Sequence, residues 1–353
     1  MSAPNLPKTI RAWTIPKSGQ PRDALLLRTD FPGPKPPSGD ALVVRVSHAA
    51  LNPADLKVVI TSPLQDLLRL LRGVAVPGMD FAGEVVAVGP QAPAHLAAPG
   101  TRVCGAYNAA PIVWGNGTLA EYITVPASVV AQQPPGWTGG AAAGLGGIAG
   151  QTAEAIMRNA RVQPGWRVLL VGISGGVGSI LVQMLKSAGA VVFGVCSESN
   201  AAMAKSLGAD EVIDYTVHKP LHAFLTQEYR DKPFDVIIDC AGSYDLFEPA
   251  KHFLNPGSLF ITIVGGVGIL QNLEYIIRDH LLPHALGGFP SYFRSVMLSP
   301  TGEFARAATQ TAAEGKVTQC PVDSEYAMEN AVEAYEKLET SRAKGKIIVK
   351  VHS

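Results

Sequence analysis

Two patterns of apolar and polar residues divide the chain. Up to about residue 130, short apolar stretches stand between glycines and prolines, as in ALVVRVSHAALN (41–52), FAGEVVAVG (81–89) and LAEYITVP (119–126). Short alternating stretches bounded by turn residues are typical of β-strands with one buried face. We therefore expect residues 1–130 to form a β-rich domain. One segment differs: PLQDLLRLLRG (63–73) predicts a short amphipathic helix, either packed on the sheet or serving as a lid over an apolar pocket.

From about residue 131 the apolar stretches become continuous and alternate with helical stretches. Strands buried on both faces are predicted at GWRVLLVG (165–172), AVVFGVC (190–196), FDVIIDCAG (234–242) and GSLFITIVG (257–265). Strands of this kind alternating with helices predict an α/β, doubly wound parallel sheet over residues 131–300. The last stretch, from about 300 to 353, ends in a strand that we expect to rejoin and complete the first domain.

A glycine-rich loop joins the first of these strands to a helix. Glycines there allow a tight turn and let backbone N–H groups approach a pyrophosphate at the helix N-terminus. The first glycine of the GxGxxG fingerprint falls on Ile173, but the required strand and helix flank the loop. We predict a Rossmann dinucleotide-binding domain. Its phosphate contacts are expected from Ser174, Gly175, Gly176, Val177 and Gly178.

The end of the next strand bears on the choice of cofactor. An NAD site usually places a carboxylate there to bind the ribose 2′-hydroxyl, whereas this chain has Cys196 and Ser197. The missing carboxylate favours NADPH, with Ser197, Lys205 and Tyr215 near its 2′-phosphate. Glu198 is the residue that argues for NADH, and Lys205 also suits an ordinary solvated helix position.

The composition excludes several classes of protein. Of 353 residues, 47% are hydrophobic and 16% charged, and 29 basic side chains balance 29 acidic ones. No overall field attracts nucleic acid or an anionic membrane. There is no stretch of signal-peptide or membrane-spanning length at the N-terminus or elsewhere, and the four cysteines are scattered. We expect a cytoplasmic protein that binds neither nucleic acid nor membrane.

Motifs along nearly the whole chain resemble the medium-chain dehydrogenase/reductases, in particular their zinc-free quinone oxidoreductase and enoyl reductase branch. These motifs are HAALNPADLK (48–57), PGMDFAGEVVAVG (77–89), GTLAEYITVP (117–126), FDVIIDCAG (234–242) and SRAKGKIIVKV (341–351). The resemblance implies a GroES-like β-rich domain and a Rossmann domain, with cofactor and substrate between them, and frequent homodimers. CSESNAAMAKSLGADEVIDY (196–215) resembles fungal trans-acting enoyl reductases, which are partners of polyketide synthases. YFRSVMLSPTGE (292–303) instead resembles mitochondrial quinone-reductase-like relatives.

The same resemblance argues against zinc. Zinc alcohol dehydrogenases of this superfamily place a Cys where this chain has Asn52, and a His-Glu pair where it has Met79 and Asp80. Zinc needs about four converging N, S or O donors, and no further Cys or His falls near residues 145–152. Without a Lewis acid, a conjugated C=C bond is a better hydride acceptor than a simple ketone. We therefore predict a metal-free NADPH reductase of α,β-unsaturated carbonyls: enones, quinones or enoyl thioesters, free or carried on an acyl carrier.

Three residues are candidates for the chemistry. Asn52 could orient the carbonyl or the nicotinamide, or simply cap a turn before Pro53. Lys57 matches a lysine of the trans-acting enoyl reductases and could serve as acid or oxyanion partner, although a surface lysine would look the same. Thr152 could bond cofactor or substrate, or cap a helix. Solvent could also be the final proton donor.

On the nicotinamide side, small residues end two strands, at the sheet edge where open α/β sheets bind ligands. The expected contacts are Cys240, Ala241, Val264 and Gly265.

Three alternatives remain open. They are a partner-dependent, trans-acting enoyl reductase of polyketide biosynthesis, a metal-free carbonyl or alcohol oxidoreductase, and a non-catalytic NADPH-binding protein. Turnover of acyl-pantetheine substrates, of saturated alcohols with NADP, or of neither would distinguish them.

Overall fold

The computed structural model describes residues 6–60, 74–107, 116–263 and 292–352. The chain forms two compact units, Met1–Gln151 together with Ser299–Ser353, and Thr152–Leu298. The helix expected at 63–73 and two expected nicotinamide contacts, Val264 and Gly265, lie outside the described residues.

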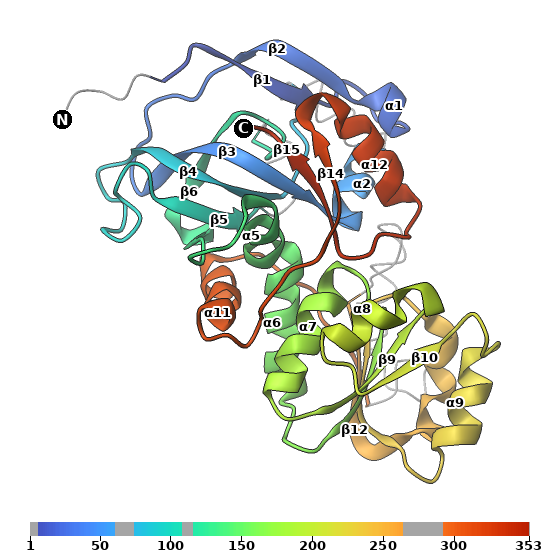
Figure 1. The fold of residues 1–353 in the computed structure, drawn as a ribbon. Helices are drawn as coiled ribbons and strands as arrows, with labels where there is room; N and C mark the ends of the chain where they lie inside the picture. The colour runs from blue at the N-terminus through green and yellow to red at the C-terminus, as the bar shows by residue number, and fades with distance from the viewer. Residues whose placement is uncertain (1–5, 61–73, 108–115, 264–291, 353) are drawn as a thin grey trace, which may run out of the picture. The chain divides into compact units, whose positions relative to one another are not determined.

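A seven-stranded sheet forms the frame of the first unit (Figure 1), in the order β14-β15-β3-β4-β5-β7 with β6 paired to β3. Its strands are β3 (Ala41–Leu51), β4 (Asp80–Val88), β5 (Arg102–Ala106), β6 (Tyr122–Pro126), β7 (Val130–Gln132), β14 (Val322–Ala327) and β15 (Lys346–Lys350). A separate hairpin pairs β1 (Thr9–Thr14) with β2 (Leu26–Pro32). The C-terminal strand β15 pairs antiparallel with β3, so that Ile348 lies opposite Ala50. The end of the chain therefore joins the N-terminal sheet, as the sequence predicts.

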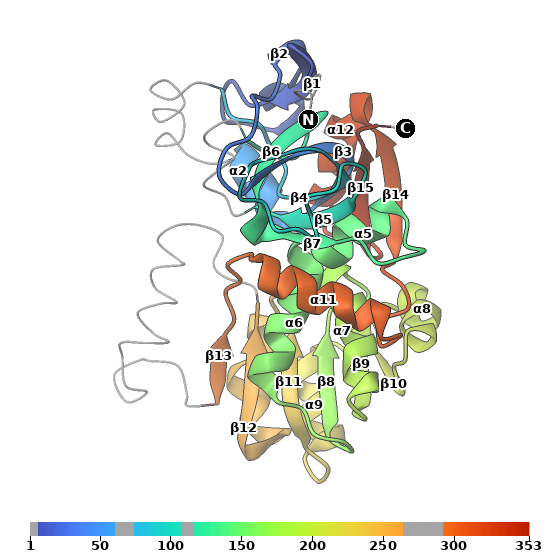
Figure 2. The ribbon, with the colours of Figure 1, turned by 90° about the vertical axis from the view of Figure 1, so that its left-hand side faces the viewer.

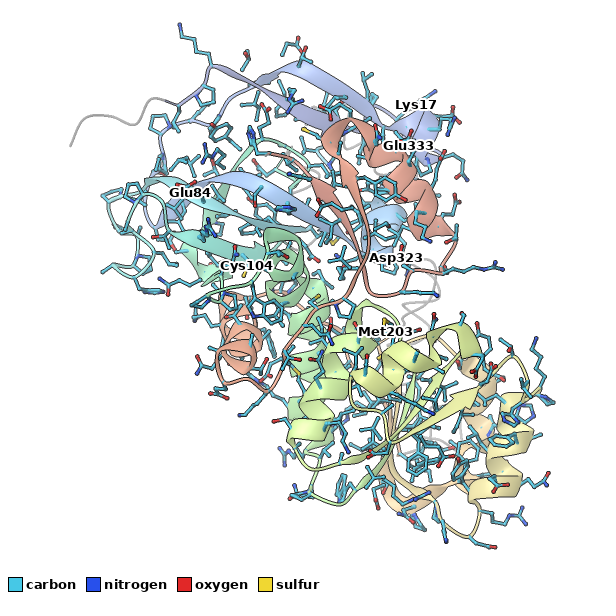
Figure 3. All side chains as sticks on the ribbon, in the orientation of Figure 1. Lys17, Glu84, Cys104, Met203, Asp323 and Glu333 are labelled. Carbon is cyan, nitrogen blue, oxygen red and sulfur yellow. The ribbon has the colours of Figure 1, made fainter. Side chains whose placement is uncertain are left out.

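The two faces of this sheet are packed differently. Large side chains of alternate positions, among them Val44, Phe81 and Ile123, form the main core. The opposite face carries small residues, among them Ala82, against which helix α5 (Gly139–Gly146) packs. Cys104, labelled in Figure 3, is another residue of this face. Because all residues of α5 except Leu145 are glycine or alanine, it fits closely on that face. The first unit consequently extends to Gln151, beyond the boundary expected near residue 130.

The other described helices of the first unit are α1 (Pro21–Ala24), α2 (Pro53–Ile60), α11 (Gly302–Ala313) and α12 (Ala331–Glu339). Helix α12 packs Ala331, Ala334 and Tyr335 into the main core. Helix α6 (Ile148–Ala160) begins in the first unit and continues into the second. Thr301 caps α11 through a hydrogen bond from Phe304 N.

The second unit is the doubly wound parallel sheet that the sequence predicts. Its strands are β8 (Arg167–Val171), β9 (Val191–Cys196), β10 (Glu211–Asp214), β11 (Phe234–Asp239), β12 (Leu254–Thr262) and β13 (Phe293–Ser295). They run parallel in the order β10-β9-β8-β11-β12-β13, which Figure 2 shows from right to left. Counted along the chain this is the order 3-2-1-4-5-6 of dinucleotide-binding sheets. The expected fold class is confirmed.

Helices on this sheet bury both of its faces, which explains the continuous apolar strands. Helix α9 (Leu221–Tyr229) packs on the face that includes Leu169 and Ile237. The neighbouring residues Val168 and Ile238 point to the other face and are equally buried. Helix α7 (Gly176–Ser187) contacts β8 and β9, and α8 (Ala201–Ser206) contacts β9 and β10. Within the described residues, no helix combines the length and apolar character needed to span a bilayer.

Candidate functional site

The loop between β8 and α7 has the geometry of a phosphate-binding turn. Gly172 adopts φ +78°, a left-handed conformation that glycine accepts without strain. Gly178 lies so close to the turn that a Cβ there would be 2.3 Å from Gly172 O and 2.7 Å from Ile173 Cα. Among the described residues no side chain caps α7, whose N-cap is Gly175. Its first N–H groups can therefore bind an anion, and the loop fits the pyrophosphate of a dinucleotide.

Other residues expected to bind the cofactor follow β9, and one unexpected residue joins them. Asn200, in the 3₁₀ turn Glu198–Asn200, donates a hydrogen bond from Nδ2 to Ser174 Oγ (3.1 Å). Since Ser174 Oγ accepts this bond, its own proton can point to a ligand. Ser197 Oγ lies 3.0 Å from Ser199 Oγ. The structure thus joins the phosphate loop to the segment after β9.

Lys205 and Tyr215 are both exposed. Lys205 lies in the last turn of α8, and Tyr215 follows β10, where its N–H donates to Cys196 O (3.3 Å). Binding of a 2′-phosphate by Lys205, Tyr215 and Ser197 together stays a prediction.

The loop after β11 is held by a buried carboxylate. Asp239 accepts hydrogen bonds from the N–H groups of Ala241 (2.9 Å), Gly242 (3.0 Å) and Ser243 (2.9 Å). Burial raises the pKa of Asp239, and these three donors oppose that shift. Cys240 lies within this loop, and burial raises the pKa of its thiol, so the thiol stays protonated. These hydrogen bonds to the Asp239 carboxylate therefore fix the backbone of the loop that carries Cys240 and Ala241.

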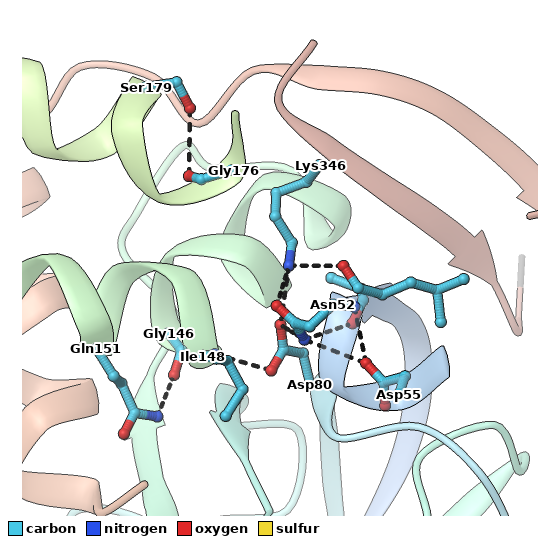
Figure 4. Close-up of polar contacts among 11 residues, drawn as sticks. Asn52, Asp55, Asp80, Gly146, Ile148, Gln151, Gly176, Ser179 and Lys346 are labelled. Atoms are coloured by element: carbon cyan, nitrogen blue, oxygen red, sulfur yellow. Dashed lines mark hydrogen bonds and ion pairs between the residues drawn. The ribbon is translucent and has the colours of Figure 1, made fainter. Parts of the chain in front are cut away.

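A buried polar network lies in the first unit (Figure 4). The Lys346 ammonium donates to Leu51 O (2.9 Å), Asn52 Oδ1 (2.6 Å) and Asp80 Oδ2 (3.2 Å). The Lys346 side chain is 3% exposed and that of Asp80 0%. All three ammonium protons thus have oxygen acceptors, which a buried charge requires.

Asp80 connects this cation to the start of α6. Its Oδ1 accepts the N–H of Ile148 (2.8 Å), the first residue of that helix, and its Oδ2 also accepts from Asn52 Nδ2 (2.9 Å). Burial raises the pKa of Asp80, whereas Lys346 and the Ile148 N–H favour its ionised form. A carboxylate at a helix N-terminus also interacts favourably with the helix dipole.

Asn52 immediately precedes α2. Asp55, the third residue of that helix, accepts the N–H of Asn52 at its Oδ2 (2.8 Å), as the third helical residue does in a capping box. The Asn52 amide is buried and bonds Lys346, Asp80 and Asp55. Turn capping and contact with a substrate carbonyl both stay predictions for this side chain.

Glycines in the stretch 139–160 make room for the network. A Cβ on Gly144 would lie 3.0 Å from Lys346 Cγ and 2.7 Å from Cys320 Sγ. A Cβ on Gly147 would lie 2.4 Å from Asp80 Cγ. Helix α5 therefore approaches the network through Gly144, and Gly147, which joins α5 to α6, leaves room for Asp80.

The other two candidates for the chemistry differ in their burial. Lys57 is exposed on α2, whereas Asp55 on the same helix is buried. Thr152 is buried as the fifth residue of α6, so N-terminal capping does not explain it. The roles proposed for both residues stay predictions.

We predict that Asp55→Asn makes the protein more stable at pH 8 but little changed at pH 4.5. Burial, followed by repulsion from Asp80, raises the pKa of Asp55 to about 7. Between pH about 4 and about 7, the unfolded chain releases this proton while the folded chain keeps it, so stability falls as the pH rises. Asparagine removes this loss, on the order of 3 kcal/mol, and still accepts the Asn52 N–H. Urea unfolding at both pH values measures the difference, and equal gains at both would contradict this account. Asp23→Asn, an exposed site on α1, is the control.

The donor set at this place does not fit zinc. Asn52, Met79 and Asp80 stand where zinc-dependent relatives have ligands, and the Lys346 ammonium lies against two of them. Within the described parts of the chain, no three His, Cys, Asp or Glu side chains are grouped so as to hold a metal ion. A metal and the ammonium would compete for the same oxygens.

Sequence reasoning missed four residues that organise these sites. Lys346 and Asp80 each begin a strand at a buried position, and Asp239 ends one at a buried position, so a charged residue at the end of a mostly buried strand was the available signal. Asn200 had no such signal, because a polar residue in a turn is common.

Comparison with known proteins matches two family models to the chain, the first within the first unit and the second across parts of both units. Residues 38–135 match the family model described as "Alcohol dehydrogenase GroES-like domain", and residues 207–349 match "Zinc-binding dehydrogenase". The chain is 31% identical over 369 residues to the medium chain reductase pydE of Acremonium sp, covering 98% of this chain and 99% of that protein. It is 31% identical over 380 residues to the trans-enoyl reductase poxH of Penicillium oxalicum, covering 97% and 98%.

Solved structures share the fold of this chain. The quinone oxidoreductase from Coxiella burnetii superposes with a TM-score of 0.77 at 24% identity, covering 97% of this chain and 99% of that one. At this identity the similarity shows the fold, that of a GroES-like domain with a Rossmann domain.

Proposed function

The chain belongs to the medium-chain dehydrogenase/reductase superfamily of oxidoreductases, and from that premise we propose that it is an NADPH-dependent reductase of C=C bonds conjugated to a carbonyl group. The substrate is an enone, an enoyl thioester or a quinone, and no metal takes part. The observation that carries this proposal is the buried Lys346–Asp80–Asn52 network, which fills with an ammonium the place of the zinc ligands in alcohol dehydrogenases. Relatives named reductases, across nearly the full chain, support the reaction type.

The Rossmann unit supplies the cofactor site. The N–H groups at the start of α7 would hold the pyrophosphate, and Ser174, oriented by Asn200, would donate to it. Ser197 and Lys205 would bind the 2′-phosphate. Ala241, in the loop fixed by Asp239, would contact the nicotinamide.

The first unit holds the acceptor. A bound reduced nicotinamide supplies a hydride to the carbon β to the carbonyl, and negative charge then develops on the carbonyl oxygen. The chain must orient the acceptor, stabilise that oxygen and allow a proton to reach the α-carbon. Asn52 is the proposed orienting group of this unit, and a contact of Thr152, the first residue of the second unit, with cofactor or substrate stays a prediction. Lys57, being exposed, can exchange protons with solvent and is the proposed donor.

A second candidate function has a specific observation in its favour. Several relatives are trans-enoyl reductases, a name that implies action on a substrate held by another protein. We propose that an acyl carrier of a polyketide synthase can present the enoyl thioester to this chain. The test compares an enoyl-pantetheine with the same acyl group on a carrier protein. A much higher kcat/KM with the carrier favours the partner-dependent enzyme, and equal values favour a free small-molecule reductase.

The cofactor assignment makes a prediction for Lys205 and Ser197. Lys205→Ala should raise the KM for NADPH by about tenfold, since a charge-assisted hydrogen bond is worth about 1.5–3 kcal/mol, and leave the KM for NADH unchanged. Ser197→Asp should shift the preference to NADH, because a carboxylate repels the 2′-phosphate and binds a 2′-hydroxyl. Steady-state kinetics with both cofactors measures this. The control Lys232→Ala changes an exposed lysine that precedes β11, at the end of the strand away from Ala241. Equal KM changes for both cofactors would contradict the assignment.

A further inference from the structure

We propose that Lys346 is a positioning residue of the reductase site: its buried ammonium acts as an internal cation that fixes the Asn52 amide and the first turn of α6. This inference rests on the proposed function, because it assigns a task in that reaction to groups outside the cofactor domain. Lys346 touches no expected ligand and acts through Asn52 and Asp80.

The network joins segments that are far apart in the sequence. Lys346 opens β15, Asn52 follows β3, and Asp80 opens β4, and the lysine is 294 residues from Asn52. From β15, this one ammonium bonds oxygens at the end of β3 (Leu51 and Asn52) and at the start of β4 (Asp80), and Asp80 extends the connection to Ile148 N. Loss of the Lys346 network would therefore release the end of β3, the start of α2 and the start of α6 together.

The ammonium also fixes which way the Asn52 amide faces. An ammonium can only donate hydrogen bonds, so the atom 2.6 Å from Lys346 Nζ must be the carbonyl oxygen Oδ1. The amide nitrogen Nδ2 then faces the acceptors Asp80 Oδ2 (2.9 Å) and Asp55 Oδ2 (3.3 Å). Removing Lys346 takes away the donor that holds Oδ1 against rotation of this amide. The orientation of Asn52 therefore depends on a charge that the network supplies.

The space around the lysine indicates a site built for this side chain. Gly144 allows its stem to pass along α5, since a Cβ would stand 3.0 Å from Lys346 Cγ. Replacing both members of a buried ion pair by uncharged groups is often neutral for stability. A variant that removes both charges can therefore keep its stability while it loses the hydrogen bond that orients Asn52.

Three variants test the proposal. Lys346→Met leaves Asp80 charged and unpaired, and we expect its melting temperature to fall on the order of 10 °C. In Lys346→Met with Asp80→Asn both charges of the pair are removed, and the asparagine that replaces Asp80 can accept from Ile148 N–H and donate to a turned Asn52. We expect this double variant to melt within about 3 °C of the wild type, while its kcat stays down by about 100-fold. NADPH affinity should stay within about twofold throughout. Lys350→Met, at the exposed end of the same strand, is the control and should match the wild type.

Three outcomes decide against the proposal. If the double variant recovers wild-type kcat together with its stability, the network is only structural. If Lys346→Met has the same melting temperature and kcat as Lys350→Met, the ammonium does not hold Asn52 or the start of α6 in place. The side-chain ¹H–¹⁵N resonances of Asn52 supply a readout without catalysis: they should move in Lys346→Met and stay in place in Lys350→Met, and unmoved resonances in both would overturn the proposal. A wild type that reduces no unsaturated acceptor, yet shows the expected resonance shift, would disprove the proposed function and leave the orientation of Asn52 by Lys346 standing.

Discussion

Alanine in place of Asp80 is expected to lower the free energy of unfolding by about 3–5 kcal/mol, the range for removing one partner of a buried charge pair. Asp80 is fully buried and accepts from Lys346 Nζ, Asn52 Nδ2 and Ile148 N. Its removal leaves an ammonium in the interior with only neutral oxygens as partners, and leaves the first N–H of α6 unpaired. Equilibrium urea unfolding at pH 7 measures the loss.

A carboxylate further along the same strand supplies the matched control. Glu84 (Figure 3) pairs with Arg45 across 2.6 Å, but the two side chains are 39% and 47% exposed. Exposed pairs of this kind contribute about 0–1 kcal/mol. Glu84→Ala should therefore change stability by less than about 1 kcal/mol. Equal losses in Asp80→Ala and Glu84→Ala would contradict the view that the buried network stabilises the first unit.

Gly178→Ala is expected to weaken NADPH binding by about 100-fold or more and to lower stability. The new Cβ would stand 2.3 Å from Gly172 O and 2.7 Å from Ile173 Cα, and both atoms belong to the backbone of the phosphate loop. The loop or the helix must shift, which moves the N–H groups that bind the pyrophosphate, and displacement by about 1 Å at such a site can cost about 100-fold. NADPH fluorescence titration and thermal unfolding measure the two effects.

Gly175→Ala tests the effect on NADPH binding separately from the effect on stability. A Cβ there meets only Gly172 O, at 3.4 Å, an ordinary contact. We expect the melting temperature to change little, while NADPH binding weakens because the methyl group lies at the mouth of the helix N-terminus. If both variants bind NADPH as the wild type does, this loop is not the phosphate site.

Periodicity along the chain predicted the two sheets because burial on one or both faces leaves a direct pattern in the sequence. The doubly wound sheet was predictable from stretches such as 165–172 and 234–242, which are apolar throughout since helices cover both faces. The domain boundary was harder to place. Residues 139–146 read as the start of the second domain, but their glycines and alanines fit the small-residue face of the first sheet.

The candidate site was only partly predictable. Local signals placed the phosphate loop, because strand, glycines and helix are contiguous there. The Lys346 network has no local signal: Asn52 and Lys346 meet across 294 residues, and only the pairing of β15 with β3 brings them together. The sequence could suggest that Asn52 and Asp80 replace zinc ligands, but not that a lysine would supply the positive charge.

The destination of the hydride tests the proposed function most directly. NADPH carrying deuterium at both C4 positions is mixed with the purified protein and an enone or an enoyl-pantetheine, with chelator present, and the product is examined by mass spectrometry and NMR. The account predicts a saturated product with one deuterium on the carbon β to an intact carbonyl group, formed at the same rate without chelator. Deuterium on the carbonyl carbon of an alcohol product, or a reaction abolished by the chelator, would contradict it.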